Sequence, residues 1–172
     1  MVVHRRREDP VSRSVGLLIS VLVRYPEVGT VKYEPRQQTI RMSLLITGEL
    51  TEDDWTRTED TFFDTLEVYH MLEQRQPAVL HVEADNLGDL TTVSITRDAS
   101  TLTPEEIYTI VEYFRERFSG RLVTEPVEMG NEDEWLAQDE AIENMVANME
   151  QSRSGRNLIA IREDGRVMVF QK

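Results

Sequence analysis

The sequence predicts an α+β fold, because strand-like and helix-like segments follow one another in the order strand, helix, strand, strand, helix, strand over residues 39–125. Apolar residues alternate with polar ones in the strand-like segments and recur every three or four positions in the helix-like segments. Both helix-like segments open with strong start signals. This order is typical of the ferredoxin-like, or split βαβ, sandwich, in which two helices cover one face of a four-stranded antiparallel sheet. Because that fold carries many unrelated activities, it does not define a function.

The first strand and helix of this unit are predicted over residues 39–47 and from Thr51 onward. Alternate positions of the strand are apolar and predict one buried face: Ile40, Met42, Leu44 and Ile46. Thr51 is followed by three acidic residues, which combine a cap with negative charge at the positive end of the helix dipole. Pro77 prevents the helix from continuing. The buried stripe of this helix is expected to comprise Trp55, Phe62, Phe63, Leu66, Tyr69 and Leu72.

The second half of the unit consists of two predicted strands, a helix and a final strand. Residues 79–84 and 90–96 show strand-like alternation, and the segment between them is rich in turn-forming residues. Thr103 and Pro104 supply a cap and a proline in the first turn, and Glu106 is positioned to complete a capping box. Gly120 suits the end of this helix. Residues 121–125 are therefore expected to form the fourth strand.

Segments on both sides of this unit complete the predicted domain organisation. Residues 1–9 are expected to be a flexible arginine-rich tail, and residues 10–125 an α+β core domain that includes an N-terminal helix to about Arg24 and a strand near residues 28–33. The polar turn segment at residues 34–38 can join this strand to residues 39–47 as two antiparallel strands, and the sequence leaves open whether the strand extends the sheet. Residues 126–172 are expected to form a C-terminal extension, with an amphipathic helix and a β-hairpin around Asp164-Gly165. An isolated hairpin is marginal in water, so this extension must pack on the core or on a partner subunit.

Composition and charge exclude several function classes. The formal net charge is −13, from 32 acidic and 19 basic residues, which disfavours binding to nucleic acid and to anionic membranes. The chain has no cysteine, which excludes disulfides, thiolate nucleophiles and sulfur-based zinc sites and suits a cytoplasmic protein. The apolar run over residues 15–23 is too short to cross a bilayer, for which about 20 residues are needed, and reads as a buried helix.

RNA binding through the sheet is also disfavoured. One common RNA-binding module has this same order of strands and helices, and its third strand presents stacking aromatic and basic side chains to the RNA. The corresponding segment, residues 90–96, contains neither kind of residue. We therefore expect no nucleic-acid partner.

Polar side chains on one face of the predicted sheet form the candidate ligand-binding site. His81 and Glu83 are two positions apart on a strand, so both point away from the apolar face. Such a face suits a small anion or a metal, although a metal would need a third ligand. His70 is instead expected to meet the negative end of its helix dipole. The candidate residues are Arg41, Ser43, His81, Glu83, Thr92 and Ser94. We predict no catalytic residue, no metal ligand set and no cofactor.

Three function hypotheses follow. The leading one is a non-catalytic cytoplasmic protein-interaction or assembly module, most simply a homodimer, since the sequence has no catalytic motif and its terminal segments need a surface to pack on. The second is a regulatory small-molecule-binding domain, and the third is a metal- or acid–base enzyme that uses the open face of the sheet. The apolar side of the last helix is the candidate interface, and its residues are Trp135, Ile142, Met145 and Met149.

Overall fold

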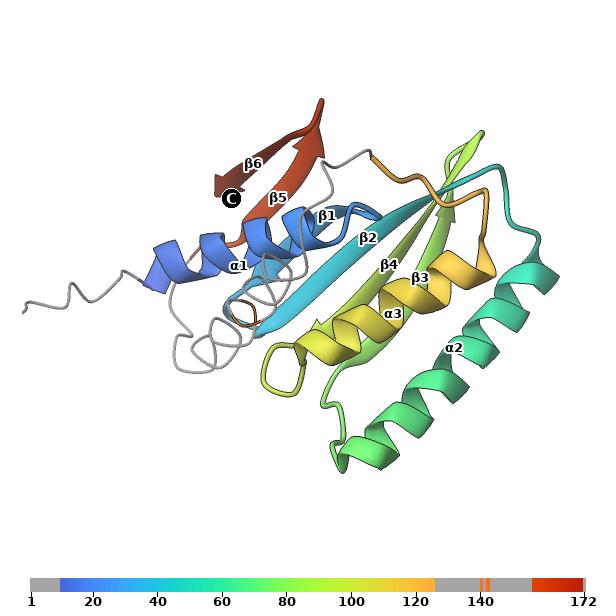
Figure 1. The fold of residues 1–172 in the computed structure, drawn as a ribbon, viewed down its shortest axis with the longest axis horizontal. Coiled ribbons are helices and arrows are strands. Elements are labelled where there is room, and N and C mark those ends of the chain that lie inside the picture. The colour runs from blue at the N-terminus through green and yellow to red at the C-terminus, as the bar shows by residue number, and fades with distance from the viewer. Residues whose placement is uncertain (1–9, 126–139, 141, 143–155, 172) are drawn as a thin grey trace, which may run out of the picture.

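The computed structural model describes residues 10–125, 140, 142 and 156–171, and these form one antiparallel sheet with three helices (Figure 1). The strand order across the sheet is β3-β4-β2-β1-β5-β6. The helices are α1 (Pro10–Arg24), α2 (Glu52–Glu73) and α3 (Pro104–Arg117). The strands are β1 (Val28–Glu34), β2 (Thr39–Thr47), β3 (Leu80–Asn86), β4 (Leu90–Asp98), β5 (Leu158–Glu163) and β6 (Arg166–Gln171).

All three helices lie on the same side of the sheet, and the hydrophobic core lies between the helices and the strands (Figure 1). Val31, Met42 and Ile95 are neighbours across β1, β2 and β4, and all are buried beneath the helices. Residues at alternate positions of these strands point to the opposite side, because successive side chains of a strand leave opposite faces. The sheet therefore has one covered face and one face that no described helix covers.

The predicted α+β class is confirmed, but the predicted fourth strand is wrong. Residues 121–125 form no strand, and Leu122 makes only an isolated bridge to Ile46. Instead β1 pairs with β2 along its length and occupies the place beside β2. The two strands are joined by a short turn in which the Gln38 N–H donates to the Pro35 carbonyl oxygen over 3.2 Å. A short loop costs little closure entropy, so this local pairing prevails over the distant segment. The four-stranded ferredoxin-like order is thus not the order observed.

The predicted C-terminal hairpin is present and extends the sheet. Asp164 and Gly165, both at positive φ, form its two-residue turn. Leu158 pairs with Tyr33, and Ile161 with Thr30, so β5 lies beside β1 within the same chain. Among the predicted interface residues, Ile142 is buried in the core cluster, and the other three lie outside the described residues: Trp135, Met145 and Met149. The division at residue 126 stays a prediction.

The buried stripe of α2 differs from the predicted one. Its buried residues are Thr58, Phe62, Leu66 and His70, which are spaced four apart. Leu72, which was expected to be buried, has an exposed fraction of 78%. It lies two positions beyond His70, about 200° further around the helix, and therefore on the solvent side. The predicted Phe62 and Leu66 are buried as expected.

A buried polar cluster joins α2, β4 and α3, and it changes the predicted roles of His70 and Glu106. The Arg97 guanidinium is fully buried and donates to Glu106 and to Asp98. The Glu106 oxygen that accepts from Arg97 Nη2, Oε1, also lies within hydrogen-bond distance of His70 Nε2. The Thr103 hydroxyl caps α3 as predicted, at 3.2 Å from the Glu106 nitrogen. The Glu106 side chain, however, pairs with Arg97 rather than closing a capping box. Buried charges need such partners, since an unpaired one is strongly unfavourable.

Candidate functional site

The six predicted ligand-binding residues all lie on the open face of the sheet. Ser43 of β2 is opposite Ser94 of β4, which is in turn opposite Glu83 of β3. At the next position on this face, Thr96 of β4 lies between Arg41 of β2 and His81 of β3. Thr92 lies beyond Ser94 on the same side of β4. The alternation that buries the apolar side chains of these strands places the polar ones together on the other face.

Strand β1 adds two residues to this face that the sequence-based site did not include. Thr30 lies opposite Ser43, and Lys32 lies opposite Arg41. The polar turn segment at residues 34–38 already indicated that this strand could pair with residues 39–47, but the sequence left open whether it extends the sheet. Placing Thr30 and Lys32 beside Ser43 and Arg41 requires the register of that pairing, which the structure gives.

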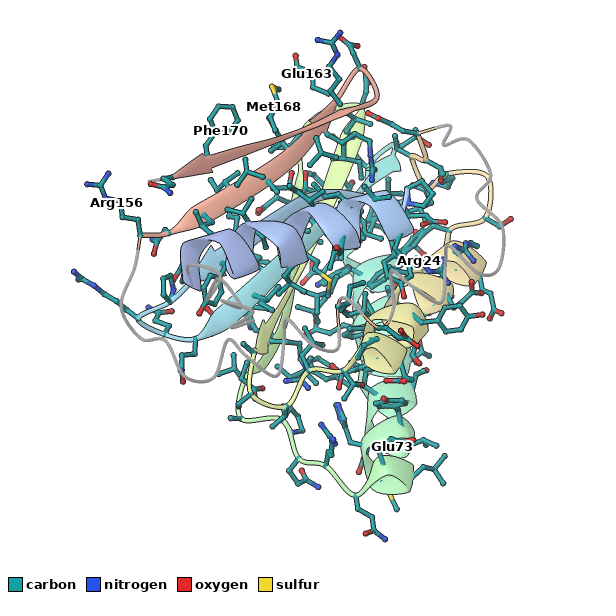
Figure 2. The ribbon with its side chains drawn as sticks, turned by 60° about the vertical axis from the view of Figure 1, so that its left-hand side comes forward. Arg24, Glu73, Arg156, Glu163, Met168 and Phe170 are labelled. Atoms are coloured by element: carbon teal, nitrogen blue, oxygen red, sulfur yellow. The ribbon has the colours of Figure 1, made fainter. Side chains whose placement is uncertain are left out.

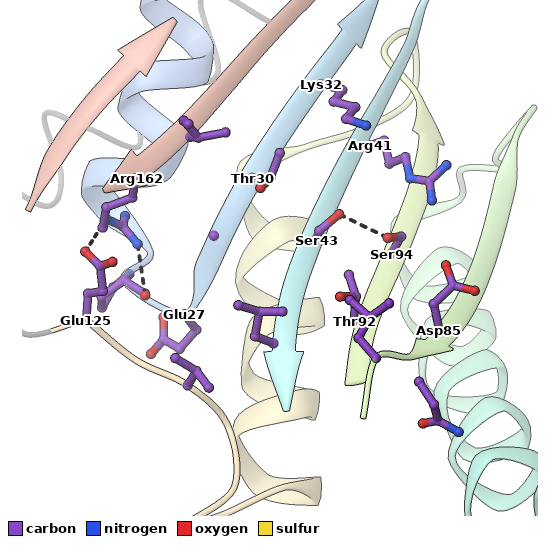
Figure 3. A pocket seen from close by; sticks show the side chains of 17 residues that line it. Glu27, Thr30, Lys32, Arg41, Ser43, Asp85, Thr92, Ser94, Glu125 and Arg162 are labelled. Carbon is purple, nitrogen blue, oxygen red and sulfur yellow. Dashed lines mark hydrogen bonds and ion pairs between the residues drawn. The ribbon is translucent and has the colours of Figure 1, made fainter. Parts of the chain in front are cut away.

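A concave pocket of about 560 Å³ covers the middle of this face (Figure 3). Its floor consists of small hydroxyl side chains, namely Thr30, Ser43, Thr92 and Ser94. Its walls come from the chain before β1, the β3–β4 turn and the segment after α3, and they include Pro26, Asn86, Leu87 and Val123. The volume lies within the range of about 300–1,000 Å³ that is typical of small-molecule sites.

Four of the six predicted residues line this pocket, and two do not. Arg41 lines it together with three of the floor hydroxyls. His81 and Glu83 lie at its margin, toward the sheet edge, and the exposed fractions of their side chains are 65% and 40%. Within the described residues, no three side chains of the metal-ligating kinds are gathered closely enough to hold a metal ion. The pair therefore lacks the third ligand that a metal site needs.

The two serines at the centre of the floor are hydrogen-bonded to each other. Ser43 Oγ and Ser94 Oγ are 3.0 Å apart, and either can be the donor. Each hydroxyl carries one hydrogen, so the mutual bond uses one hydrogen and leaves the other. The pair can therefore offer one O–H donor and several acceptor positions to a ligand above the floor.

Two basic side chains lie beside each other at one end of the pocket. Lys32 and Arg41 occupy directly opposite positions on β1 and β2, where like charges destabilise a sheet. The Arg41 guanidinium is paired with the Glu83 carboxylate, whose second oxygen is 3.6 Å from His81 Nε2. Lys32 has no ion-pair or hydrogen-bond partner among the described residues, and its amine points toward Arg41 (Figure 3). The pocket thus contains a cation whose charge is not neutralised by the described part of the chain.

The third basic residue of the pocket, Arg162, has a structural role. Its guanidinium donates to the backbone carbonyl oxygens of Pro26 and Val28 over 3.0 and 2.9 Å, and its Nε lies 3.8 Å from Glu125 (Figure 3). Burial lowers the pKa of this guanidinium, and the carboxylates of Glu125 and Glu27 oppose the shift. Arg162 therefore links the hairpin to the start of β1, and its guanidinium donors are used in these contacts rather than directed at a ligand.

Acidic residues lie at other sides of the pocket. Glu27 is buried and accepts hydrogen bonds from Arg115 of α3, with the Nε donor at 3.0 Å. Asp85 lies across the floor from Lys32 and has no partner among the described residues (Figure 3). The charge of the pocket is thus divided, with a basic end at Lys32 and Arg41 and an acidic side at Asp85.

The comparisons with known proteins identify no relative: no family model, no curated protein and no solved structure matches the chain. In the described part of the chain, none of the helices has the length and apolar character that crossing a bilayer requires. The fold and the site together define an α+β protein with a single antiparallel sheet, three described helices on one face and a polar pocket on the other.

Proposed function

We propose that this protein is a small-molecule-binding domain that binds an organic anion in the pocket on the open face of its sheet. The observation that carries the proposal is the position of Lys32 directly opposite Arg41, beside a floor of hydroxyl groups. Two adjacent cations destabilise the unliganded sheet, and a bound carboxylate or phosphate would relieve their repulsion. The role is one of binding and regulation rather than catalysis.

The arrangement of Arg41 supports recognition of a planar or multidentate anion. The Glu83 carboxylate holds the guanidinium from the β3 side, and His81 lies next to that carboxylate. A guanidinium has five N–H donors, so pairing with Glu83 leaves others for a ligand. In this proposal Glu83 is a positioning residue for Arg41, which differs from an acid–base role.

The remaining lining indicates that the anion is an organic molecule rather than a free inorganic ion. Leu45, Leu87, Val123 and Ile161 contribute apolar surface beside the hydroxyl floor. The volume of about 560 Å³ exceeds the space that one phosphate or carboxylate group fills. A ligand with an anionic group at Lys32 and a partly apolar body toward Val123 would use both kinds of surface.

Thermal unfolding of the full chain with anionic probes tests this proposal. Citrate and glycerol 3-phosphate at about 10 mM should raise the melting temperature in a concentration-dependent way, whereas glycerol should not. Lys32→Ala should weaken the effect by about tenfold in apparent affinity, because it removes the cation without a partner. The matched control is Arg36→Ala, which removes one positive charge from the exposed β1–β2 turn outside the pocket lining and should leave the response unchanged. Equal responses of the two variants, or no response of the wild type to either anion, would reject anion binding at Lys32.

Two finer expectations from the sequence belong to the same proposal. A cytoplasmic location is supported by the absence of cysteine. A ferredoxin-like arrangement within the core is supported by the order β3-β4-β2, by α2 and α3 on one face, and by the antiparallel bridge from Leu122 to Ile46 where a fourth strand would begin.

A protein-interaction or assembly role is the second candidate function. The specific observation in its favour is the apolar strand β6 at one edge of the sheet. The metal- or acid–base alternative has weaker support, because Glu83 is already paired with Arg41 and because His81 lies outside the pocket lining.

A further inference from the structure

We propose that two copies of this chain associate edge to edge through β6 and so form one continuous sheet across a twofold axis. This inference goes beyond ligand binding and uses the β6 edge, whose apolar patch meets the pocket at Ile161. Strand β6 is the last strand of the sheet, and no described strand pairs with its outer edge. Unpaired strand edges present rows of N–H and C=O groups that can bind another strand.

The hairpin geometry shows which backbone groups of β6 face outward. A two-residue turn makes the flanking residues, Glu163 and Arg166, a hydrogen-bonded pair. Because hydrogen-bonded and non-bonded pairs alternate in an antiparallel ladder, Met168 and Phe170 also bond to β5. The N–H and C=O groups of the intervening residues point away from β5, and these residues are Val167, Val169 and Gln171. Strand β6 therefore presents outward-facing N–H and C=O groups at three alternate residues.

The side chains of β6 do not protect this edge, whereas those of the opposite edge do. Between Arg166 and Gln171 the strand contains only apolar residues, without proline or an acidic group. Strand β3, at the other edge, carries His81, Glu83 and Asp85. Charged side chains are the usual means by which proteins prevent edge pairing. Because the chain has a net charge of −13, two copies repel each other electrostatically. Strand β6 carries no acidic side chain, so this repulsion is weaker where two β6 edges approach.

An apolar patch on the open face of the hairpin adjoins the β6 edge. Met168 lies opposite Ile161 and Phe170 lies opposite Ile159, so these four side chains share one face. Phe170 has an exposed fraction of 51%, and the side chains of Met168 and Phe170 project from the outer strand (Figure 2). Val167 and Val169 point to the other face, where they pack against the core.

An antiparallel pairing of β6 with itself joins the two patches. If Val169 lies opposite Val169 of the second copy, all three outward-facing sites of each strand are used, and Met168 lies opposite Phe170 of the second copy. The contact is isologous, so it closes at two subunits. Pairing β6 with β3 of another copy would instead build an open chain and would place apolar side chains against Glu83 and Asp85. The geometry therefore favours the twofold dimer.

Light scattering of the full chain during gel filtration tests this proposal. The wild type should elute at about 40 kDa, twice the 20.0 kDa of one chain, when loaded at about 100 µM. Met168→Lys places a charge in the joined patch and should raise the dimer dissociation constant by about tenfold or more, so that on dilution the variant falls toward 20.0 kDa at a concentration at which the wild type is still dimeric. The matched control is Leu72→Lys, which makes the same kind of change at an exposed apolar residue of α2 and should remain dimeric.

The following results would overturn the proposal. They are a monomeric wild type at about 100 µM, a Met168→Lys variant that stays dimeric with native circular dichroism, and a Leu72→Lys variant that dissociates to the same extent. A mass above that of the dimer would also contradict it, because it would indicate open, head-to-tail pairing. Lys32→Ala should leave the mass of the dimer unchanged, so failure of the ligand proposal and failure of this one are distinguishable.

Discussion

At the scale of residues, the cluster around Arg97 places several charged groups in the described core. Its guanidinium is fully buried and is shared between Glu106 and Asp98, and it also donates to the Thr101 hydroxyl over 3.0 Å. Such a cluster stabilises the fold only when every member is satisfied, because the low dielectric that strengthens each bond also penalises an unpaired group. Each member is therefore sensitive to substitution.

Glu106→Ala should lower the free energy of unfolding by about 4 kcal/mol, because it leaves the Arg97 charge buried without one of its two carboxylate partners. Glu105→Ala is the matched control, since Glu105 is exposed in the same first turn of α3 and should change stability by less than about 1 kcal/mol. Urea denaturation of the two variants measures the difference. Similar losses for both would show that the cluster does not carry this energy.

The pKa of Asp98 makes the stability of the protein depend on pH. Burial alone would raise this pKa, but hydrogen bonds from Thr101, Val79 and Ser100 and the charge of Arg97 together lower it from 3.8 to about 2. A lowered folded-state pKa means that the folded protein binds the proton less well than the unfolded chain does. The resulting stabilisation is complete above about pH 4 and is lost as the pH falls through about 2.

Asp98→Asn tests that dependence. At neutral pH the variant should be less stable than the wild type, and the gap in the free energy of unfolding should narrow by about 2 kcal/mol between about pH 6 and about pH 2. Denaturant unfolding at a series of pH values measures the gap. A gap that stays constant over this range would mean that the Asp98 pKa is not lowered in the folded state.

At the scale of elements, the helix starts are the features that follow most directly from local sequence. Thr51 and Thr103 both accept a hydrogen bond from the residue three positions later, as their capping signals predicted. Thr103 has a second contact that local sequence does not reveal, since its hydroxyl is 2.8 Å from the Tyr69 hydroxyl of α2. The cap of α3 therefore also joins the two helices.

Thr103→Ala should destabilise the protein by about 1–2 kcal/mol, because it removes the cap and leaves the Tyr69 hydroxyl without this partner. Thr103→Ser retains the hydroxyl and should recover most of the loss. Thermal and urea unfolding of both variants provide the comparison. If serine does not restore stability, the methyl group rather than the hydroxyl makes the important contact.

Local sequence predicted the two hairpins but not the place of β1 in the order of the strands. The strands themselves were predicted near their observed bounds, but β1 rather than residues 121–125 lies beside β2. Alternation reports which side of a strand is apolar, and it carries no information about which strand is the neighbour. The same limit explains why four pocket residues were predicted on β2 and β4, while Lys32 and Thr30 of β1 were not.

At the scale of the whole molecule, the two faces and two edges of the sheet have different chemistry. The helices cover the apolar face, the open face holds the pocket, β3 is a charged edge and β6 an apolar one. The two proposed activities use different elements, since the basic end of the pocket lies on β1 and β2 and the proposed dimer contact on β6, with Ile161 of β5 between them. We therefore expect that Met168→Lys retains the response to anions and that Lys32→Ala retains the dimer, which calorimetry and light scattering can show on the same samples.

Sequence by itself determined the class of fold, the helices and their caps, the terminal hairpin and the polar character of the open face. These properties depend on neighbours a few positions apart, where periodicity and capping chemistry act. Only the tertiary structure decided the order of the strands, the pairing of Glu106 with Arg97, and the meeting of Lys32 with Arg41. The two side-chain pairs are each nine positions apart in sequence, and the strand order joins more distant segments. All three properties depend on how separate elements pack into a shared core, which the periodicity of a single element does not encode.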